Sequence, residues 1–298
     1  MRTSADANRV IRSSACAGTA VDGRLGMWKS AVVDSVTLHV AARRYLMDRY
    51  DELVDQYAAL PDQGRAGFGY RPEAYRIFPR YNVVEAMLAQ VERLDPDRLP
   101  DQPSLLAWLV EAAATARSSF TEPVPNEVAA TVMAEERRLF SSVVREWAGR
   151  GDLQVQPLPY RRVLTSAESV ARQQQLQRRW GLVDRSWHPM IAAEAPPEVL
   201  ILVEAVMWEL PEAVTYVRTA LRAAGGGRVT ELREYGEEYL IDMDLVAPRY
   251  TGAEGVWSDD TLTWIAYASH EGTVAFGGHL AATLPTLWPD LDRWRWSP

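Results

Sequence analysis

Reactive side chains are scarce in this chain of 298 residues. It contains one cysteine, Cys16, and four histidines, which excludes disulfide frameworks, thiolate zinc sites and paired-cysteine redox motifs. Lys29 is the one lysine beside 31 arginines. Phosphate-loop hydrolysis and Schiff-base chemistry both need a positioned ammonium group. We expect neither, because Lys29 lies in an N-terminal stretch without helical or strand periodicity.

Long apolar runs and an excess of positive charge are also missing. No run approaches the roughly 18 apolar residues that a membrane span needs, and residues 1–26 have no apolar core of the length that a secretory signal requires. The formal net charge of -8 argues against general attraction to nucleic acid backbones. We therefore expect a soluble, cytoplasmic protein of bacterial type, with neither a membrane nor a nucleic acid as its partner.

The first half of the chain has the pattern of helices. Apolar side chains recur at spacings of three and four over about 36–60, which predicts a long amphipathic helix. Further helices are predicted after an Asn82 cap, after Pro103 and after an Asn126 cap. Following a disordered or loosely docked arm over 1–29, these elements predict an antiparallel helical domain over 30–151.

The second half changes to alternating and β-branched segments bounded by turn residues. These segments predict strands over 159–164, 199–208, 228–234, 238–242, 261–269 and 273–278. Helices are predicted over 165–180, with Thr165 and Glu168 as a capping box, and over 211–224. The expected fold class is α+β, in which the helical domain precedes a mixed or antiparallel sheet domain with a few helices over 152–298.

The last two strands allow a prediction of register. If Glu271 and Gly272 form a two-residue turn, Tyr267 lies opposite Phe276. That face would be apolar and aromatic, as a sheet face that covers a core should be. On the same pattern His270 and His279 lie roughly 20 Å apart, so they cannot share a metal ion.

No constellation of residues has the spacing of a metal or cofactor site, and we expect neither group. Glu136 falls on the apolar stripe of the helix after Asn126. A buried carboxylate there needs a cationic partner or has a raised pKa. It is therefore either a catalytic acid or, as we favour, half of an ion pair with Arg117 or Arg43.

Two aromatic segments are typical of contact surfaces. The loop over 68–81 mixes tyrosine and phenylalanine with arginine, which suits a protein partner or an anionic ligand. Tryptophan and arginine, enriched at binding hot spots, alternate near the end of the chain. The candidate binding residues are Tyr70, Arg71, Tyr75, Arg76, Phe78, Arg80, Trp294 and Trp296.

Several strings of residues resemble a bacterial protein family that has no established activity. They are LPYRRVL at 158–164, ELREYG at 231–236, GAEG at 252–255, WIAYASHE at 264–271 and YNV at 81–83. The resemblance supplies no catalytic residue. The hairpin over 264–277 also resembles strands of small immunity proteins that neutralise toxins.

Two functions are compatible with these observations. The first is a cytoplasmic protein-interaction module, toxin-neutralising or regulatory, that acts through the aromatic and arginine side chains of the loop. The alternative is an enzyme with a site between the domains, where Glu136, His188 or His270 serves as acid or base on a small anionic substrate. A cleft that holds one of these groups would favour the enzyme.

Overall fold

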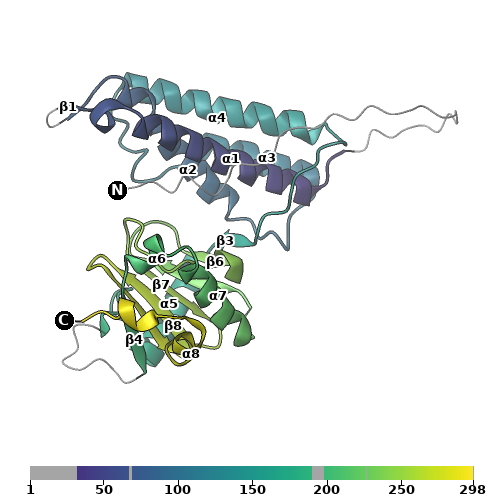
Figure 1. Ribbon diagram of the computed structural model, residues 1–298. Coiled ribbons are helices and arrows are strands. Elements are labelled where there is room, and N and C mark those ends of the chain that lie inside the picture. The colour runs from purple at the N-terminus through teal and green to yellow at the C-terminus, as the bar shows by residue number, and fades with distance from the viewer. Residues whose placement is uncertain (1–31, 67–68, 190–197, 226, 298) are drawn as a thin grey trace, which may run out of the picture. The chain divides into compact units, whose positions relative to one another are not determined.

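The computed structural model describes residues 32–66, 69–189, 198–225 and 227–297. The arm predicted over 1–29, with Cys16 and Lys29, lies outside these residues, as does Phe68 of the aromatic loop. The protein has an α+β fold: helices form the first half of the described chain, and an antiparallel sheet forms the second (Figure 1). Within the described residues no helix is long and apolar enough to cross a membrane.

Four helices pack around one apolar core in the first half. They are α1 (Ser35–Ala58), α2 (Phe78–Val91), α3 (Gln102–Thr115) and α4 (Glu127–Ala148). Leu46, Met87, Leu109 and Phe140, one from each helix, are fully buried in this core. Side chains of Asp34, Asp101 and Asn126 accept hydrogen bonds at the N-termini of α1, α3 and α4. The Asn126 cap is therefore confirmed.

The prediction of an Asn82 cap is wrong. Helix α2 begins at Phe78, with Pro79 in its first turn, where the missing N–H of proline costs no hydrogen bond. Asn82 lies inside the helix and donates from its amide to the Phe120 carbonyl oxygen (3.4 Å).

Between α1 and α2 the chain forms two 3₁₀ turns, η1 (Pro61–Gly64) and η2 (Ala74–Arg76), and a short hairpin of β1 (Arg65–Ala66) and β2 (Gly69–Tyr70).

The second half is built on a seven-stranded sheet with the order β3-β6-β5-β7-β8-β9-β4, in which all neighbours are antiparallel. The strands are β3 (Arg161–Val163), β4 (Val199–Val203), β5 (Val229–Arg233), β6 (Tyr239–Ile241), β7 (Gly255–Asp259), β8 (Trp264–Ser269) and β9 (Thr273–Gly278). Strand β7 has no counterpart among the predicted strands. The strand predicted over 199–208 ends at Val203, because Val206–Glu209 forms helix α6.

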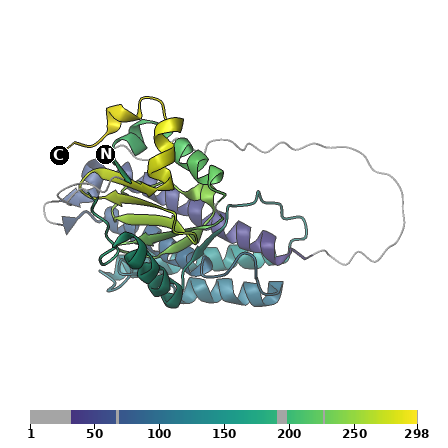
Figure 2. The ribbon, with the colours of Figure 1, turned by 90° about the horizontal axis from the view of Figure 1, so that it is seen from below.

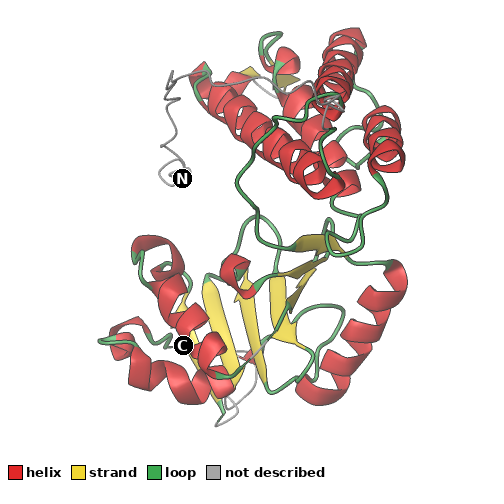
Figure 3. Cartoon of the chain, turned by 90° about the vertical axis from the view of Figure 1, so that its right-hand side faces the viewer, coloured by secondary structure: helices red, strands yellow, loops and turns green. Residues whose placement is uncertain are grey.

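Apolar side chains cover both faces of the sheet, and Figure 3 shows helices on either side of its strands. Helices α7 (Ala213–Ala223) and α8 (His279–Leu287) pack on the face that carries Trp264 and Phe276. Helix α5 (Ser166–Trp180) contributes Leu176 to the opposite face, which carries Tyr267. Figure 2 shows α5 on one side of the sheet and α8 on the other. The Thr165 capping box of α5 is confirmed.

The hairpin of β8 and β9 has a different register from the predicted one. Ser269 pairs with Thr273, and Tyr267 pairs with Ala275 instead of Phe276. The loop therefore contains three residues, His270 to Gly272. Gly272 has φ = +72°, the left-handed conformation that closes three-residue hairpin loops and that glycine adopts without strain.

A buried ion-pair cluster joins helical and sheet segments within residues 32–298, which form one compact unit. Glu92, at the end of α2, accepts hydrogen bonds from Arg43 (2.9 Å) and Arg161 (3.1 Å). Its backbone oxygen accepts from the Val163 N–H (2.8 Å). The Arg161 guanidinium also lies over the Tyr239 ring, 3.8 Å from its centre. The Glu92 side chain is 2% exposed and that of Arg43 is 4% exposed, so loss of the carboxylate would leave Arg43 buried without its anion.

Candidate functional site

A groove lined by aromatic side chains lies on the helical half. Its volume is about 620 Å³. We refer to it as the aromatic groove, and its lining consists of Tyr50, Tyr57, Tyr70, Tyr75, Phe78, Tyr81, Asn82, Glu85, Ser119, Phe120, Pro123 and Pro125. Three of the predicted binding residues, Tyr70, Tyr75 and Phe78, are among them. The other rings come from α1, from α2 and from the segment between α3 and α4.

Six of these rings form a continuous series of contacts. Tyr50 lies against Tyr81 (5.9 Å between ring centres), and Tyr81 lies against Tyr57 (5.7 Å). Tyr57 contacts Phe78 (6.4 Å), which in turn contacts Tyr70 (5.0 Å) and Tyr75 (5.2 Å). The rings are tilted or perpendicular to one another, the arrangement that their quadrupoles favour. The series makes a continuous aromatic wall along the groove.

The charged groups at one end of the groove are carboxylates. Glu85 lines the groove one helical turn after Tyr81, and Asp51 follows Tyr50 on α1. Partial loss of water raises the pKa of Glu85, which Arg233 lowers only in part. Desolvation, with Glu85 and Asp51 nearby, raises the pKa of Tyr50. Desolvation and the neighbouring tyrosines raise the pKa of Tyr81 to about 12. Tyr50 and Tyr81 are therefore neutral hydroxyls, and Glu85 and Asp51 are the groups that carry negative charge at this end when they are ionised.

The arginines of the predicted loop do not line the groove. Arg71 holds the loop together by donating to the Arg65 carbonyl oxygen (3.1 Å) and to Asp62 (3.2 Å). Arg76 is exposed. Arg80 donates to Glu135 and Glu136 (2.5 and 2.6 Å). The aromatic residues of the loop therefore line the groove, whereas Arg71 and Arg80 form structural ion pairs outside it.

Glu136 is a structural anion, and the two partners that we expected for it are wrong. It is 1% exposed and accepts from Arg49 (2.6 Å) and from Arg80, not from Arg117 or Arg43. Burial would raise the pKa of Glu136, but the hydrogen bonds of the two guanidinium groups outweigh burial and lower it. The carboxylate is therefore ionised and fully engaged.

The terminal tryptophans pack on the sheet. Trp294 contacts the apolar cluster on the face that carries Trp264, and Trp296 contacts the cluster on the opposite face. The backbone N–H of Trp296 donates to the Ile201 carbonyl oxygen at the edge of the sheet (3.0 Å). Both side chains are half-buried, so most of their surface serves the core.

A second constellation surrounds a buried carboxylate that the sequence did not single out, Glu254. The pairing of Gly255 with Ala268, extended by one residue, places Glu254 across from Ser269 on the face that carries Tyr267. Its oxygens accept hydrogen bonds from several donors. These are the hydroxyls of Tyr267, Ser269 (3.2 Å) and Ser186 (3.2 Å), the His270 N–H (3.3 Å) and His270 Nδ1 (2.5 Å). We refer to these residues with His188 as the Glu254 cluster.

The Glu254 cluster brings together two of the predicted candidates, His188 and His270. His188 Nε2 lies 3.2 Å from the Tyr267 hydroxyl and 3.7 Å from Glu254. Burial would raise the pKa of Glu254, but the bonds from Tyr267 and His270 lower it below its ordinary value. The hydrogen bond to Glu254 in turn raises the pKa of His270, whose imidazole is 57% exposed. Glu136 lies in another cluster and takes no part.

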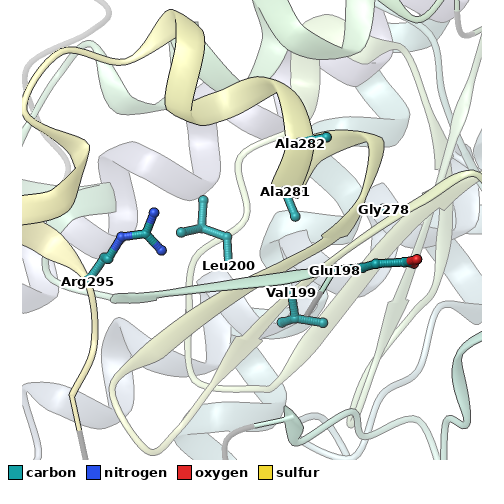
Figure 4. Close-up of a pocket in the computed structure, with 7 residues that line it drawn as sticks. All are labelled: Glu198, Val199, Leu200, Gly278, Ala281, Ala282 and Arg295. Carbon is teal, nitrogen blue, oxygen red and sulfur yellow. The ribbon is translucent and has the colours of Figure 1, made fainter. Parts of the chain in front are cut away.

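Another hollow, of about 500 Å³, lies beside the edge strand β4 and helix α8 (Figure 4). Its walls are mostly aliphatic or small, from Val199, Leu200, Ala281 and Ala282. Within the described part of the chain, no group of three or more histidine, cysteine and acidic side chains is arranged to hold a metal ion. The aromatic groove and the Glu254 cluster are therefore the two candidate sites that we consider.

Comparison of the chain with protein-family models, with curated proteins and with solved structures finds no match. Functional inference consequently depends on the geometry of these two places. Composition alone pointed to the aromatic loop. The tyrosines of α1 were visible in the sequence as an apolar stripe, but only the fold shows that they complete the groove.

Proposed function

We propose that the protein is an interaction module that binds a protein partner through the aromatic groove. The observation that carries this proposal is the wall of six contacting rings around an open hollow. Tyr70 is 43% exposed and Phe120 is 69% exposed, so apolar surface remains available on both sides of the groove. Exposed aromatic side chains on a stiff frame supply contact area at small entropic cost. A module of this kind acts by covering its partner, as toxin-neutralising and regulatory proteins do.

A site-specific crosslink tests this proposal. A photoreactive phenylalanine in place of Tyr70 should form a covalent adduct with one partner in the producing cell, to be identified by mass spectrometry. The matched control carries the same group in place of Val170, which is 52% exposed on α5. Adducts of the same composition from both positions, or none from Tyr70, would contradict binding at the groove.

The Glu254 cluster favours a second candidate function, an enzyme that uses acid–base catalysis. Glu254 Oε1 lies 2.5 Å from His270 Nδ1, so the buried carboxylate fixes the orientation of an exposed imidazole. The other ring nitrogen, Nε2, pairs with the exposed Glu271 (3.1 Å) and can reach a substrate once that side chain rotates. His270 would then act as the general base and Glu254 as its positioning residue.

Hydrolysis of small ester and phosphate-ester substrates, measured against pH, tests this second function. His270→Ala should lower any specific rate by at least about 100-fold. His279→Ala, which removes a half-buried imidazole of α8, should leave it unchanged. A rate that survives in the His270 variant excludes the imidazole as the base.

A further inference from the structure

The aromatic groove has a chemistry that selects among partners, and this inference rests on the function proposed above. Arginine side chains stack on aromatic rings at four places in the described residues, Arg161 on Tyr239, Arg179 on Trp180, Arg228 on Tyr160 and Arg249 on Trp208. None of these pairs involves a ring of the groove. Within the described residues no guanidinium of the chain stacks on the groove, so the ring surface that lines it can receive a cation from another molecule.

Two carboxylates act on the Tyr50 end of the groove, Glu85 in its lining and Asp51 next to Tyr50, and within the described residues neither forms an ion pair. Asp48, Asp51 and Asp55 form an exposed stripe on α1, three and four residues apart, and Glu85 lies on α2. Burial and repulsion by Asp48 and Asp55 raise the pKa of Asp51. The cations that act on this region are Arg65, beside Tyr57, and Arg233, which acts on Glu85. They leave an excess of negative charge at the Tyr50 end.

We propose that the aromatic groove binds an arginine side chain in a basic segment of the protein partner, with the guanidinium stacked at Tyr50 and Tyr81 and paired with Glu85. A guanidinium suits this site better than an ammonium because it is planar, weakly hydrated and able to form a two-pronged bond with a carboxylate. The aspartates on the exposed face of α1 lie outside the groove. A basic segment that continues past the groove is attracted by them as well, whereas one small cation in the groove is not.

Calorimetric titration with synthetic peptides tests this inference. The probes are an acetylated, amidated peptide of alternating arginine and glycine, the same peptide with lysine for arginine, and tetramethylammonium chloride. We expect the arginine peptide to bind at least about fivefold more tightly than the lysine peptide. Its affinity should rise as the pH increases through the pKa of Glu85, because protonation removes the charge that the guanidinium needs.

Two pairs of variants separate the site from general electrostatic attraction. Glu85→Gln should weaken the arginine peptide about threefold to tenfold, whereas Glu111→Gln, the same change at an exposed site on α3, should not. Tyr50→Leu should weaken it by a similar factor, and Tyr235→Leu, at a residue 62% exposed in the other half, should not. Thermal melting of each variant identifies any loss of folding, and Glu85→Gln is isosteric, so it tests the site even if Tyr50→Leu unfolds.

The outcomes distinguish this inference from the proposed function. Equal binding of the arginine and lysine peptides, or equal losses in the Glu85 and Glu111 variants, would reduce the effect to net charge and overturn the inference. Tighter binding of tetramethylammonium than of the arginine peptide would make the ligand a small cation and also overturn it. If the Tyr70 crosslink captures a partner whose contact segment is not basic, the proposed interaction module is supported and the arginine site is contradicted. If no crosslink forms, both proposals are contradicted.

Discussion

Replacement of Glu254 by glutamine should destabilise the protein strongly, because the carboxylate is the acceptor for an entire polar cluster. Five donor groups point at its two oxygens: three hydroxyls, one backbone N–H and one imidazole nitrogen. Glutamine keeps the size of the side chain but turns one acceptor oxygen into an NH₂ donor. At least two donors then face a donor in a site where Glu254 is 2% exposed.

The magnitude follows from the cost of buried groups that lose their partners. Each costs about 1–3 kcal/mol, and rotation of the serine and tyrosine hydroxyls relieves part of it. We expect a loss of about 3 kcal/mol in the free energy of unfolding, measured by urea titration. The control is Glu271→Gln, next to the same imidazole but 57% exposed, which should change stability by less than about 0.5 kcal/mol.

The effect should also depend on pH with a defined sign. The folded protein holds the pKa of Glu254 below its ordinary value. Its contribution is thus present above the pKa of an unfolded glutamate, about 4.3, and is lost as the pH falls through the lower folded pKa. The difference between wild type and Glu254→Gln should shrink over that acidic interval. A loss below about 1 kcal/mol at neutral pH, or one independent of pH, would show that the donors have alternative partners and refute the reasoning.

Three further predictions concern stability and can be checked by the same titration. Glu92→Gln leaves two arginines without their anion and should cost about 3–5 kcal/mol, whereas Glu111→Gln should cost almost nothing. Gly278→Ala should cost at least about 2 kcal/mol, because φ is +62° and the new Cβ would lie 2.2 Å from the Thr263 oxygen; Gly225→Ala, with similar φ but open space, should cost less. Burial lowers the pKa of His39 to about 4, so the neutral ring stabilises the fold above about pH 6.5, and about 3 kcal/mol is lost as the pH falls to 4. A variant that replaces only this histidine should lose about 3 kcal/mol less than the wild type between pH 6.5 and 4, and an equal loss in the two proteins would contradict the assignment.

Local signals predicted much of the secondary structure. The Asn126 and Thr165 caps bond to backbone groups three residues away, so their residue types alone carry the information. The Asn82 cap failed because Pro79 offers an earlier start to the same helix. The two-residue turn failed because Gly272 can close a three-residue loop equally well, and composition does not tell the two apart.

The candidate sites depend on contacts between distant residues. Tyr50 and Tyr57 of α1 meet the aromatic loop only after α1 and α2 pack together. Glu254 contacts His188 and Ser186, which precede it by more than sixty residues. The local pattern at Gly252–Gly255 indicates a turn and says nothing about these partners.

Scarcity of reactive residues was the main argument against catalysis, and the Glu254 cluster shows why that argument is weak. Chemistry depends on proximity, and two of the four histidines contact one carboxylate. The contact between the carboxylate and the imidazoles depends on the pairing of strand β7 with β8. Once Gly255 is paired with Ala268, the alternation of side chains along the two strands places Glu254 beside Tyr267 and Ser269, and the three-residue loop leaves His270 out of the ladder with its ring against the same carboxylate. The imidazole and the carboxylate are thus brought together by strand register, which counting residue types cannot detect.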